Sequence, residues 1–253
     1  MRDSSGFTSA WPGGYFEGDP RDPFGLSSYF HLGYVSSLYA TYLVCLKPHV
    51  TSETNVLEIG PGRGAWTKAI LALGPKMVWA LDAASDEHTG FSAYVGSSSH
   101  VQYHQVKDES LREVPDRKID LFFSFGVFCH LPEQVVGSYL VSLYDKMAPG
   151  AHGYFLVADF EQRSAAARNA SALDRLFSLR RFSAHRFTHR VVTKVFRNKF
   201  DQSLRHTAGV EPRWYDIGKV RAGELAQFAG FEVSEIDVGT CPRDPILHII
   251  KPG

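Results

Sequence analysis

The residues with the clearest chemical meaning are three glycines that follow an apolar run. The segment from Val56 to Trp66 reads Val-Leu-Glu-Ile-Gly-Pro-Gly-Arg-Gly-Ala-Trp, with glycines at positions 60, 62 and 64. Glycine lets the backbone turn sharply and approach a ligand without a clash at Cβ. A helix after Gly64 would present free N–H groups and the positive end of its dipole. The spacing therefore predicts a strand, a ligand-binding loop and a helix.

An acidic residue before the loop indicates which kind of ligand it binds. Glu58 lies two residues before Gly60. A pyrophosphate gains nothing from a negative charge at this place, whereas a ligand with a cationic amino group and a sulfonium centre does. The alternative is a tight strand-to-helix turn that carries an incidental acid. We interpret Trp66, one turn inside the helix, as a packing residue.

Two further acids follow the next two expected strands. Asp82 ends the run that starts at Trp79, and it can accept hydrogen bonds from both hydroxyls of a ribose. The alternative for Asp82 is to cap the helix that follows. Asp108 comes after the third strand, with Glu109 as a substitute at the next position. Because ligands bind at the carboxyl ends of strands in open α/β sheets, we expect these acids at one edge.

Together these motifs resemble those of class I S-adenosylmethionine-dependent methyltransferases, over about residues 30–160. The resemblance implies a Rossmann-like fold with S-adenosylmethionine as cofactor. It implies that the glycine loop passes under the amino acid part of the cofactor and that Asp108 bonds the adenine amino group. The cofactor-binding residues expected on this basis are Glu58, Gly60, Pro61, Gly62, Gly64, Asp82, Asp108 and Phe125.

The residues expected to assist catalysis follow the fourth and fifth strands. Methyl transfer is an in-line displacement, so positioning supplies most of the catalysis, and an oxygen nucleophile also needs a general base. His130 follows the fourth strand and carries an imidazole suited to that task, although it could simply begin a helix. Asp159 follows the fifth strand and is the second candidate, with helix capping as its alternative.

A metal is a further expectation at this edge of the sheet. Asp159, Glu161 and His130 would together form an oxygen and nitrogen cluster suited to Mg²⁺. Some sugar O-methyltransferases, which this chain resembles, use such a metal. No fixed spacing in the sequence demands one. The neighbouring Cys129 is interpreted as a small apolar filler.

The segments around Glu58 and His130 are similar to those of sugar O-methyltransferases of glycan pathways. A narrower similarity is to the mannoside O-methyltransferases of methylmannose polysaccharide biosynthesis. The resemblance implies a sugar or glycan hydroxyl as acceptor, and the alternative is a small-molecule N- or O-methyltransferase of secondary metabolism. Enzymes that methylate amino groups of nucleic acids often have an Asp/Asn-Pro-Pro-aromatic motif after the fourth strand, where this chain has Ser124-Phe-Gly-Val. No nucleic-acid partner is therefore expected.

The elements that must position these residues alternate along the chain. Such alternation predicts an α/β fold with a doubly wound, mostly parallel seven-stranded sheet covered by helices on both faces. The strands are expected at 55–59, 77–81, 101–106, 119–125, 153–158, 231–238 and 246–250. The helices are expected at 27–46 (capped by Ser27 or Ser28), 65–73, 133–147 and 221–229, the last stopped by Gly230.

Composition bounds the remaining expectations. The 253 residues are interpreted as one domain, with residues 1–26 as an arm or lid and 160–213 as a basic helical insertion after the fifth strand. The insertion holds 12 of the 27 Lys and Arg residues and 4 of the 27 Asp and Glu residues. It either binds an anionic substrate, forms a solvated face, or pairs with the acidic remainder in an oligomer. Without a signal peptide, a membrane span or a Cys-x-x-Cys pair, we expect a cytoplasmic enzyme.

Overall fold

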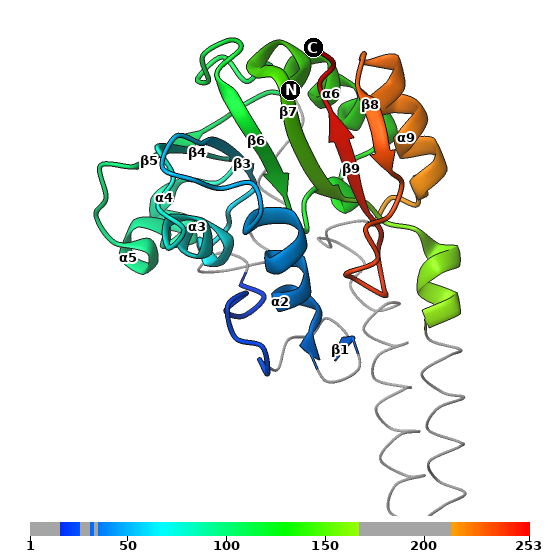
Figure 1. Ribbon diagram of the computed structural model, residues 1–253, viewed down its shortest axis with the longest axis horizontal. Coiled ribbons are helices and arrows are strands. Elements are labelled where there is room, and N and C mark those ends of the chain that lie inside the picture. The colour runs from blue at the N-terminus through cyan, green and yellow to red at the C-terminus, as the bar shows by residue number, and fades with distance from the viewer. Residues whose placement is uncertain (1–15, 26–30, 33–34, 167–213) are drawn as a thin grey trace, which may run out of the picture.

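A seven-stranded sheet organises the chain in the computed structural model, which describes residues 16–25, 31–32, 35–166 and 214–253 (Figure 1). The strand order is β5-β4-β3-β6-β7-β9-β8. Strands β3 to β7 are parallel to one another, and β9 is antiparallel to both β7 and β8. The bounds are Asn55–Ile59 (β3), Met77–Asp82 (β4), Val101–Gln105 (β5), Ile119–Ser124 (β6), Met147–Leu156 (β7), Glu232–Glu235 (β8) and Ile246–Ile250 (β9). The predicted doubly wound, mostly parallel sheet is confirmed.

The direction in which strands are added reverses between β3 and β6. From β3 the chain builds outward through β4 to β5, and it then returns to place β6 on the other side of β3. Ligands of open α/β sheets bind in the crevice outside the carboxyl ends of the strands at such a reversal. The loops after β3 and β6 are therefore the first place to look for a functional site.

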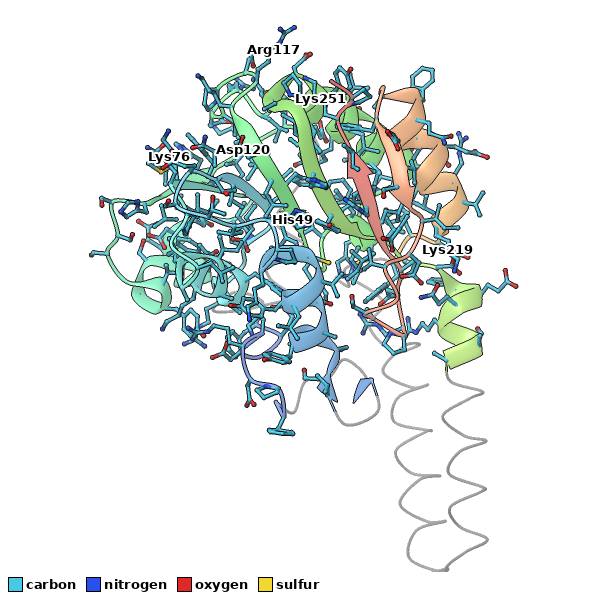
Figure 2. All side chains as sticks on the ribbon, viewed as in Figure 1. His49, Lys76, Arg117, Asp120, Lys219 and Lys251 are labelled. Carbon is cyan, nitrogen blue, oxygen red and sulfur yellow. The ribbon has the colours of Figure 1, made fainter. Side chains whose placement is uncertain are left out.

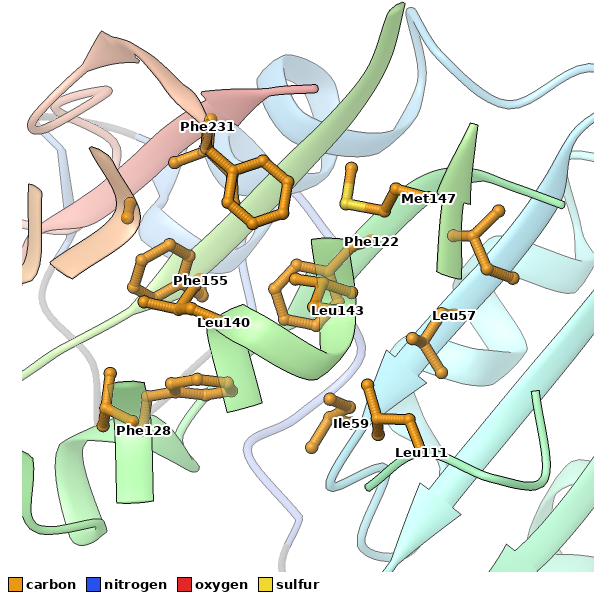
Figure 3. Packing of buried hydrophobic residues seen from close by; sticks show 14 of the residues in the cluster. Leu57, Ile59, Leu111, Phe122, Phe128, Leu140, Leu143, Met147, Phe155 and Phe231 are labelled. Carbon is orange, nitrogen blue, oxygen red and sulfur yellow. The ribbon is translucent and has the colours of Figure 1, made fainter. Parts of the chain in front are cut away.

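The sheet is buried on both faces, as its nearly continuous apolar strands require. Phe122 of β6 packs with α6 on one face, whereas its neighbours Leu121 and Phe123 pack with α3 on the other. Figure 3 shows the first cluster, in which Leu140 of α6 lies beside Phe155 and Leu143 beside Phe122. The helices that cover the sheet are α2 (Ser37–Thr41), α3 (Ala65–Leu71), α4 (Asp86–Thr89), α5 (Phe91–Val95), α6 (Glu133–Lys146) and α9 (Lys219–Phe228). Short 3₁₀ and π turns occupy Phe128–His130 (η2) and Tyr42–Leu46 (η1).

The N-terminal region differs from the helix expected over residues 27–46. Strands β1 (His31–Leu32) and β2 (Val35–Ser36) pair in an antiparallel ladder, and helical structure starts only at Ser37. It then continues through η1 and stops before Pro48, as predicted. An apolar stripe in a short segment fits either element, and pairing with a second strand decided the outcome here. The expected capping residues Ser27 and Ser28 lie outside the described residues.

The other element boundaries differ by a few residues. Strand β7 begins at Met147, six residues before the expected start, because Met147 pairs with Ile119 of β6. Helix α9 is followed by Gly230, whose φ of 101° confirms its predicted role as a helix stop. A helix begins at Phe160 and is described as far as residue 166, so most of the expected basic insertion lies outside the described residues. Among the described helices, none is both long and apolar enough to cross a membrane.

Candidate cofactor site

The glycine loop joins β3 to α3 at the strand reversal, and its backbone requires glycine. The φ angles of Gly60 and Gly64 are 73° and 98°. A Cβ at Gly60 would lie 2.0 Å from Cγ2 of Val127, and one at Gly64 would lie 2.3 Å from Cγ2 of Val95. Packing against Val127 and Val95 therefore leaves no room for a side chain at Gly60 or Gly64. The loop is a pre-shaped turn at the predicted place.

Glu58 lies buried at the end of β3, with 2% of its surface exposed. The hydroxyl of Thr67, on α3, donates a hydrogen bond of 2.6 Å to its Oε2. Burial raises the pKa of Glu58 to about 8; the hydrogen bond from Thr67 opposes this rise, and the charge of Asp82 contributes to it. A buried carboxyl in this state gains strongly from a cationic ligand group nearby.

Asp82 ties the glycine loop to the end of β4. Its carboxylate accepts hydrogen bonds from the backbone N–H groups of Gly62, at 3.0 Å, and Ala84, at 2.9 Å. Burial raises the pKa of Asp82, and these backbone bonds lower it. The structure thus gives Asp82 a role in shaping the loop, and ribose binding stays a prediction.

Two other predicted cofactor residues have partners within the protein. Asp108 is partly exposed after β5, where it accepts hydrogen bonds from Ser110 and pairs with Arg112. These contacts, those of Ser110 first, lower the pKa of Asp108. Phe125 is buried at 4% exposure, and its ring centroid lies 4.9 Å from that of Trp66. Trp66 is itself buried at 3% exposure, which confirms its packing role.

One acid near the loop was missed by the sequence analysis. Glu17 belongs to the described part of the N-terminal arm, residues 16–25, and only 8% of it is exposed. It lies close enough to Glu58 for the two charges to interact. A single acid in an irregular segment carries no signal in the sequence.

His130 stands at the end of η2 beside an aromatic and cationic group. Its ring meets the ring of Trp214 edge-on, with centroids 4.7 Å apart. The guanidinium carbons of Arg163 and Arg243 lie 5.5 and 4.7 Å from the Trp214 centroid. We call these four residues the Trp214 cluster. Because η2 follows β6, His130 lies at the same carboxyl edge of the sheet as the glycine loop, and Trp214 packs against it there.

Asp159 occupies the junction of two helices. Its Oδ1 accepts from the N–H of Gln162 at 2.9 Å, and its Oδ2 accepts from the N–H of Lys219, labelled at the start of α9 in Figure 2, at 3.2 Å. These are the free N–H groups that helix N-termini leave unpaired. The contacts favour the capping alternative for Asp159.

The Mg²⁺ cluster expected from Asp159, Glu161 and His130 does not form. In the part of the chain that the structure describes, no group of three or more His, Cys, Asp or Glu side chains is placed to hold a metal ion. The reason is local, because Asp159 caps two helices, Glu161 is exposed and His130 packs on Trp214. Cys129 is fully buried, as expected of a filler residue.

A second group of titratable side chains lies elsewhere on the sheet, near the labelled His49 in Figure 2. His49 bonds the hydroxyl of Tyr154 through Nε2 at 2.8 Å, and His152 bonds His248 at 2.8 Å. Burial lowers the pKa of His49 and of His248 to about 4, with His152 contributing to both. We call His49, His152 and His248 the histidine cluster.

The methyltransferase domain family model matches residues 34–199. Among solved structures of S-adenosylmethionine-dependent methyltransferases, the fold is similar to one from Mesorhizobium loti (TM-score 0.57, 13% identity, 85% of this chain and 98% of that one). It is also similar to a putative one from Listeria monocytogenes (TM-score 0.55, 14% identity, 85% and 100%).

Two further similarities involve named activities. The first is to the 1,6-didemethyltoxoflavin-N1-methyltransferase of Burkholderia thailandensis, solved with 1,6-didemethyltoxoflavin and S-adenosylhomocysteine (TM-score 0.53, 14% identity, 86% and 79% of the two chains). The second is to ribosomal RNA small subunit methyltransferase A of Synechococcus sp. (strain CC9902), 29% identical over 92 residues. That match spans 36% of this chain and 32% of the curated relative.

Proposed function

Because this chain belongs to the methyltransferase domain family, we propose that it transfers the methyl group of S-adenosylmethionine to a small acceptor beside the Trp214 cluster. The observation that carries the proposal is the glycine loop at the strand reversal, with buried Glu58 beneath it. The three glycines carry no side chain that would stand between the backbone of the loop and a ligand.

The glycine loop and the acids next to it have different roles in cofactor binding. Glu58 supplies a buried carboxyl group that ionises when the cationic amino acid part binds beside it. Asp82 holds the loop through the N–H of Gly62, which keeps its backbone in one shape. When bound, the cofactor supplies an electrophilic methyl group, so the protein has only to orient the acceptor and remove its proton.

We propose a sugar or glycan hydroxyl as the acceptor. Trp214 is partly exposed and provides an aromatic surface of the kind on which the C–H side of a sugar ring stacks, and the guanidinium group of Arg163 beside it can donate to sugar oxygens. The centroids of the His130 and Trp214 rings are 4.7 Å apart, so a hydroxyl group bound beside Trp214 would lie near the imidazole. His130 would act as the general base.

The second candidate is methylation of a small heteroaromatic or other metabolite at nitrogen or oxygen. The observation in its favour is the fold similarity to an N-methyltransferase solved with its small-molecule substrate. An aromatic acceptor would also stack on Trp214. Such an acceptor with a free nitrogen lone pair needs no general base, so the two candidates differ in their dependence on His130.

A methyl-transfer assay with labelled cofactor tests the function and separates the candidates. The acceptor panel contains mannosides, other glycans, phosphosugars and heteroaromatic amines, with and without EDTA. For a hydroxyl acceptor, His130→Ala lowers kcat by about two to four powers of ten with unchanged affinity for S-adenosylhomocysteine. The matched control, His100→Ala, removes an exposed histidine ahead of β5 and leaves kcat unchanged.

A further inference from the structure

We propose that Glu17, supplied by the N-terminal arm, is a second carboxylate of the cofactor site and binds the ammonium group of the cofactor together with Glu58. The inference rests on the proposed function and goes beyond it, because no motif places a ligand-binding residue in the arm. It assigns the arm a part in recognising the amino acid portion of the methyl donor.

The arm is seated on the elements that surround the glycine loop. The ring of Phe16 meets Tyr94 of α5 edge-on, with centroids 5.4 Å apart. Gly18 lies against α2, since a Cβ there would be 3.6 Å from Cδ1 of Leu38. Glu17, between these two anchors, is consequently held inward with 8% of its surface exposed. Its burial beside Glu58 follows from the anchoring of its neighbours on both sides.

Neighbouring cations are committed to other partners. Arg21, the nearest basic residue along the arm, pairs with Asp19. Lys68 donates to the carbonyl of Tyr94 at 3.3 Å and lies 4.6 Å from the centroid of that ring. The ion pairs found among the described residues include neither Glu17 nor Glu58.

Two buried carboxyl groups that form no ion pair with the described residues are costly to ionise. Burial raises the pKa of Glu17 to about 8, and the charge of Glu58 adds to this. The indole N–H of Trp66, which forms no well-formed hydrogen bond within the described structure, lowers the pKa of Glu17. The pair therefore retains protons near neutral pH and favours a ligand that brings a positive charge.

An ammonium group bound between the two carboxylates reverses this situation. The positive charge stabilises the ionised forms, so binding expels a proton and the affinity rises with pH between about 6 and 8. A ligand without the amino acid portion has no charge to offer and binds without this proton release. The pairing thus predicts that Glu17 strengthens only the binding of ligands that carry the ammonium group. A general packing role of Glu17 predicts no such dependence.

Isothermal titration calorimetry with two ligands tests the inference. S-adenosylhomocysteine carries the ammonium group, whereas 5′-methylthioadenosine has the same nucleoside without it. Glu17→Gln should weaken the first ligand by about 10- to 100-fold and leave the second unchanged. Titration in buffers of different ionisation enthalpy at pH 7 should show about one proton released by the wild type and fewer by the variant. Glu53→Gln, an exposed acid before β3, is the matched control.

The outcomes separate the inference from the function on which it rests. Equal weakening of both ligands by Glu17→Gln, or no weakening of either, overturns the role of Glu17 while the proposed function stands. Failure of wild-type protein to bind S-adenosylhomocysteine overturns both. The variant should fold, because glutamine removes a buried ionisable group, and urea unfolding at pH 9 should show it at least as stable as the wild type.

Discussion

Gly60 and Gly74 offer a direct comparison of what the glycine loop demands. Their φ angles are 73° and 74°, so alanine at either position meets the same backbone strain. Their surroundings differ, because a Cβ at Gly74 has no heavy atom within 4 Å, whereas one at Gly60 lies 2.0 Å from Cγ2 of Val127. Any excess cost of Gly60→Ala over Gly74→Ala therefore measures the packing beneath the loop.

Backbone strain and overpacking contribute separately to the loss of stability in these variants. Alanine in the left-handed region costs about 1–2 kcal/mol, which is the whole expectation for Gly74→Ala. At Gly60, rotation of the Val127 side chain brings only partial relief, since its Cβ would still lie 3.2 Å from the new methyl group, which is tighter than an ordinary contact. Overpacking of this kind adds about 1–3 kcal/mol, so Gly60→Ala should lose about 2–5 kcal/mol in all.

Urea unfolding followed by circular dichroism measures both variants, and calorimetry with S-adenosylhomocysteine measures their cofactor affinity. Gly60→Ala should also bind the cofactor at least tenfold more weakly, because the loop must shift, whereas Gly74→Ala should bind normally. The double variant Gly60→Ala/Val127→Ala should recover part of the excess through a coupling between neighbours. Equal losses of stability for the two single variants would refute the reasoning.

Three further predictions follow from the contacts around the sheet. Asp159→Asn should keep turnover within about threefold, since asparagine caps helices as well as aspartate does, whereas Asp159→Ala should lose about 1–3 kcal/mol of stability. A hundredfold fall in kcat for the asparagine variant would instead identify Asp159 as a general base. Trp214→Ala should raise the acceptor KM about tenfold without changing the cofactor Kd, and an unchanged KM would remove the Trp214 cluster from acceptor binding. Because the pKa values of His49 and His248 are lowered to about 4 in the folded state, the unfolded chain takes up protons first as pH falls below about 6.5, and stability is lost between there and pH 4. The double variant His49→Gln/His248→Gln should flatten that loss by about 1–2 kcal/mol in urea titrations, allowing for solvent exposure, and an unaltered slope would contradict the assignment.

The sheet was predictable because its strands are short apolar runs bounded by turn residues. The bounds of β3 and β9 are those expected, and the loop after β3 was placed by its glycines alone. Parallel strands buried on both faces leave this signal in the sequence.

Features that depend on distant contacts were not predictable. The pairing of β1 with β2 replaced part of an expected helix, because an apolar stripe does not reveal a strand partner. Asp159 was placed correctly after a strand, yet its bond to Lys219 joins residues 60 apart in the sequence. Glu17 is buried because the arm packs on α2 and α5, which no local pattern announces.

The central claim is that the loop from Gly60 to Gly64 holds the methyl donor. A crystal structure with S-adenosylhomocysteine tests it most directly. We predict that the amino acid part of the ligand lies over this loop, with its ammonium group within hydrogen-bond distance of Glu58 or Glu17. A ligand bound elsewhere, with the loop closed against it, would contradict the account.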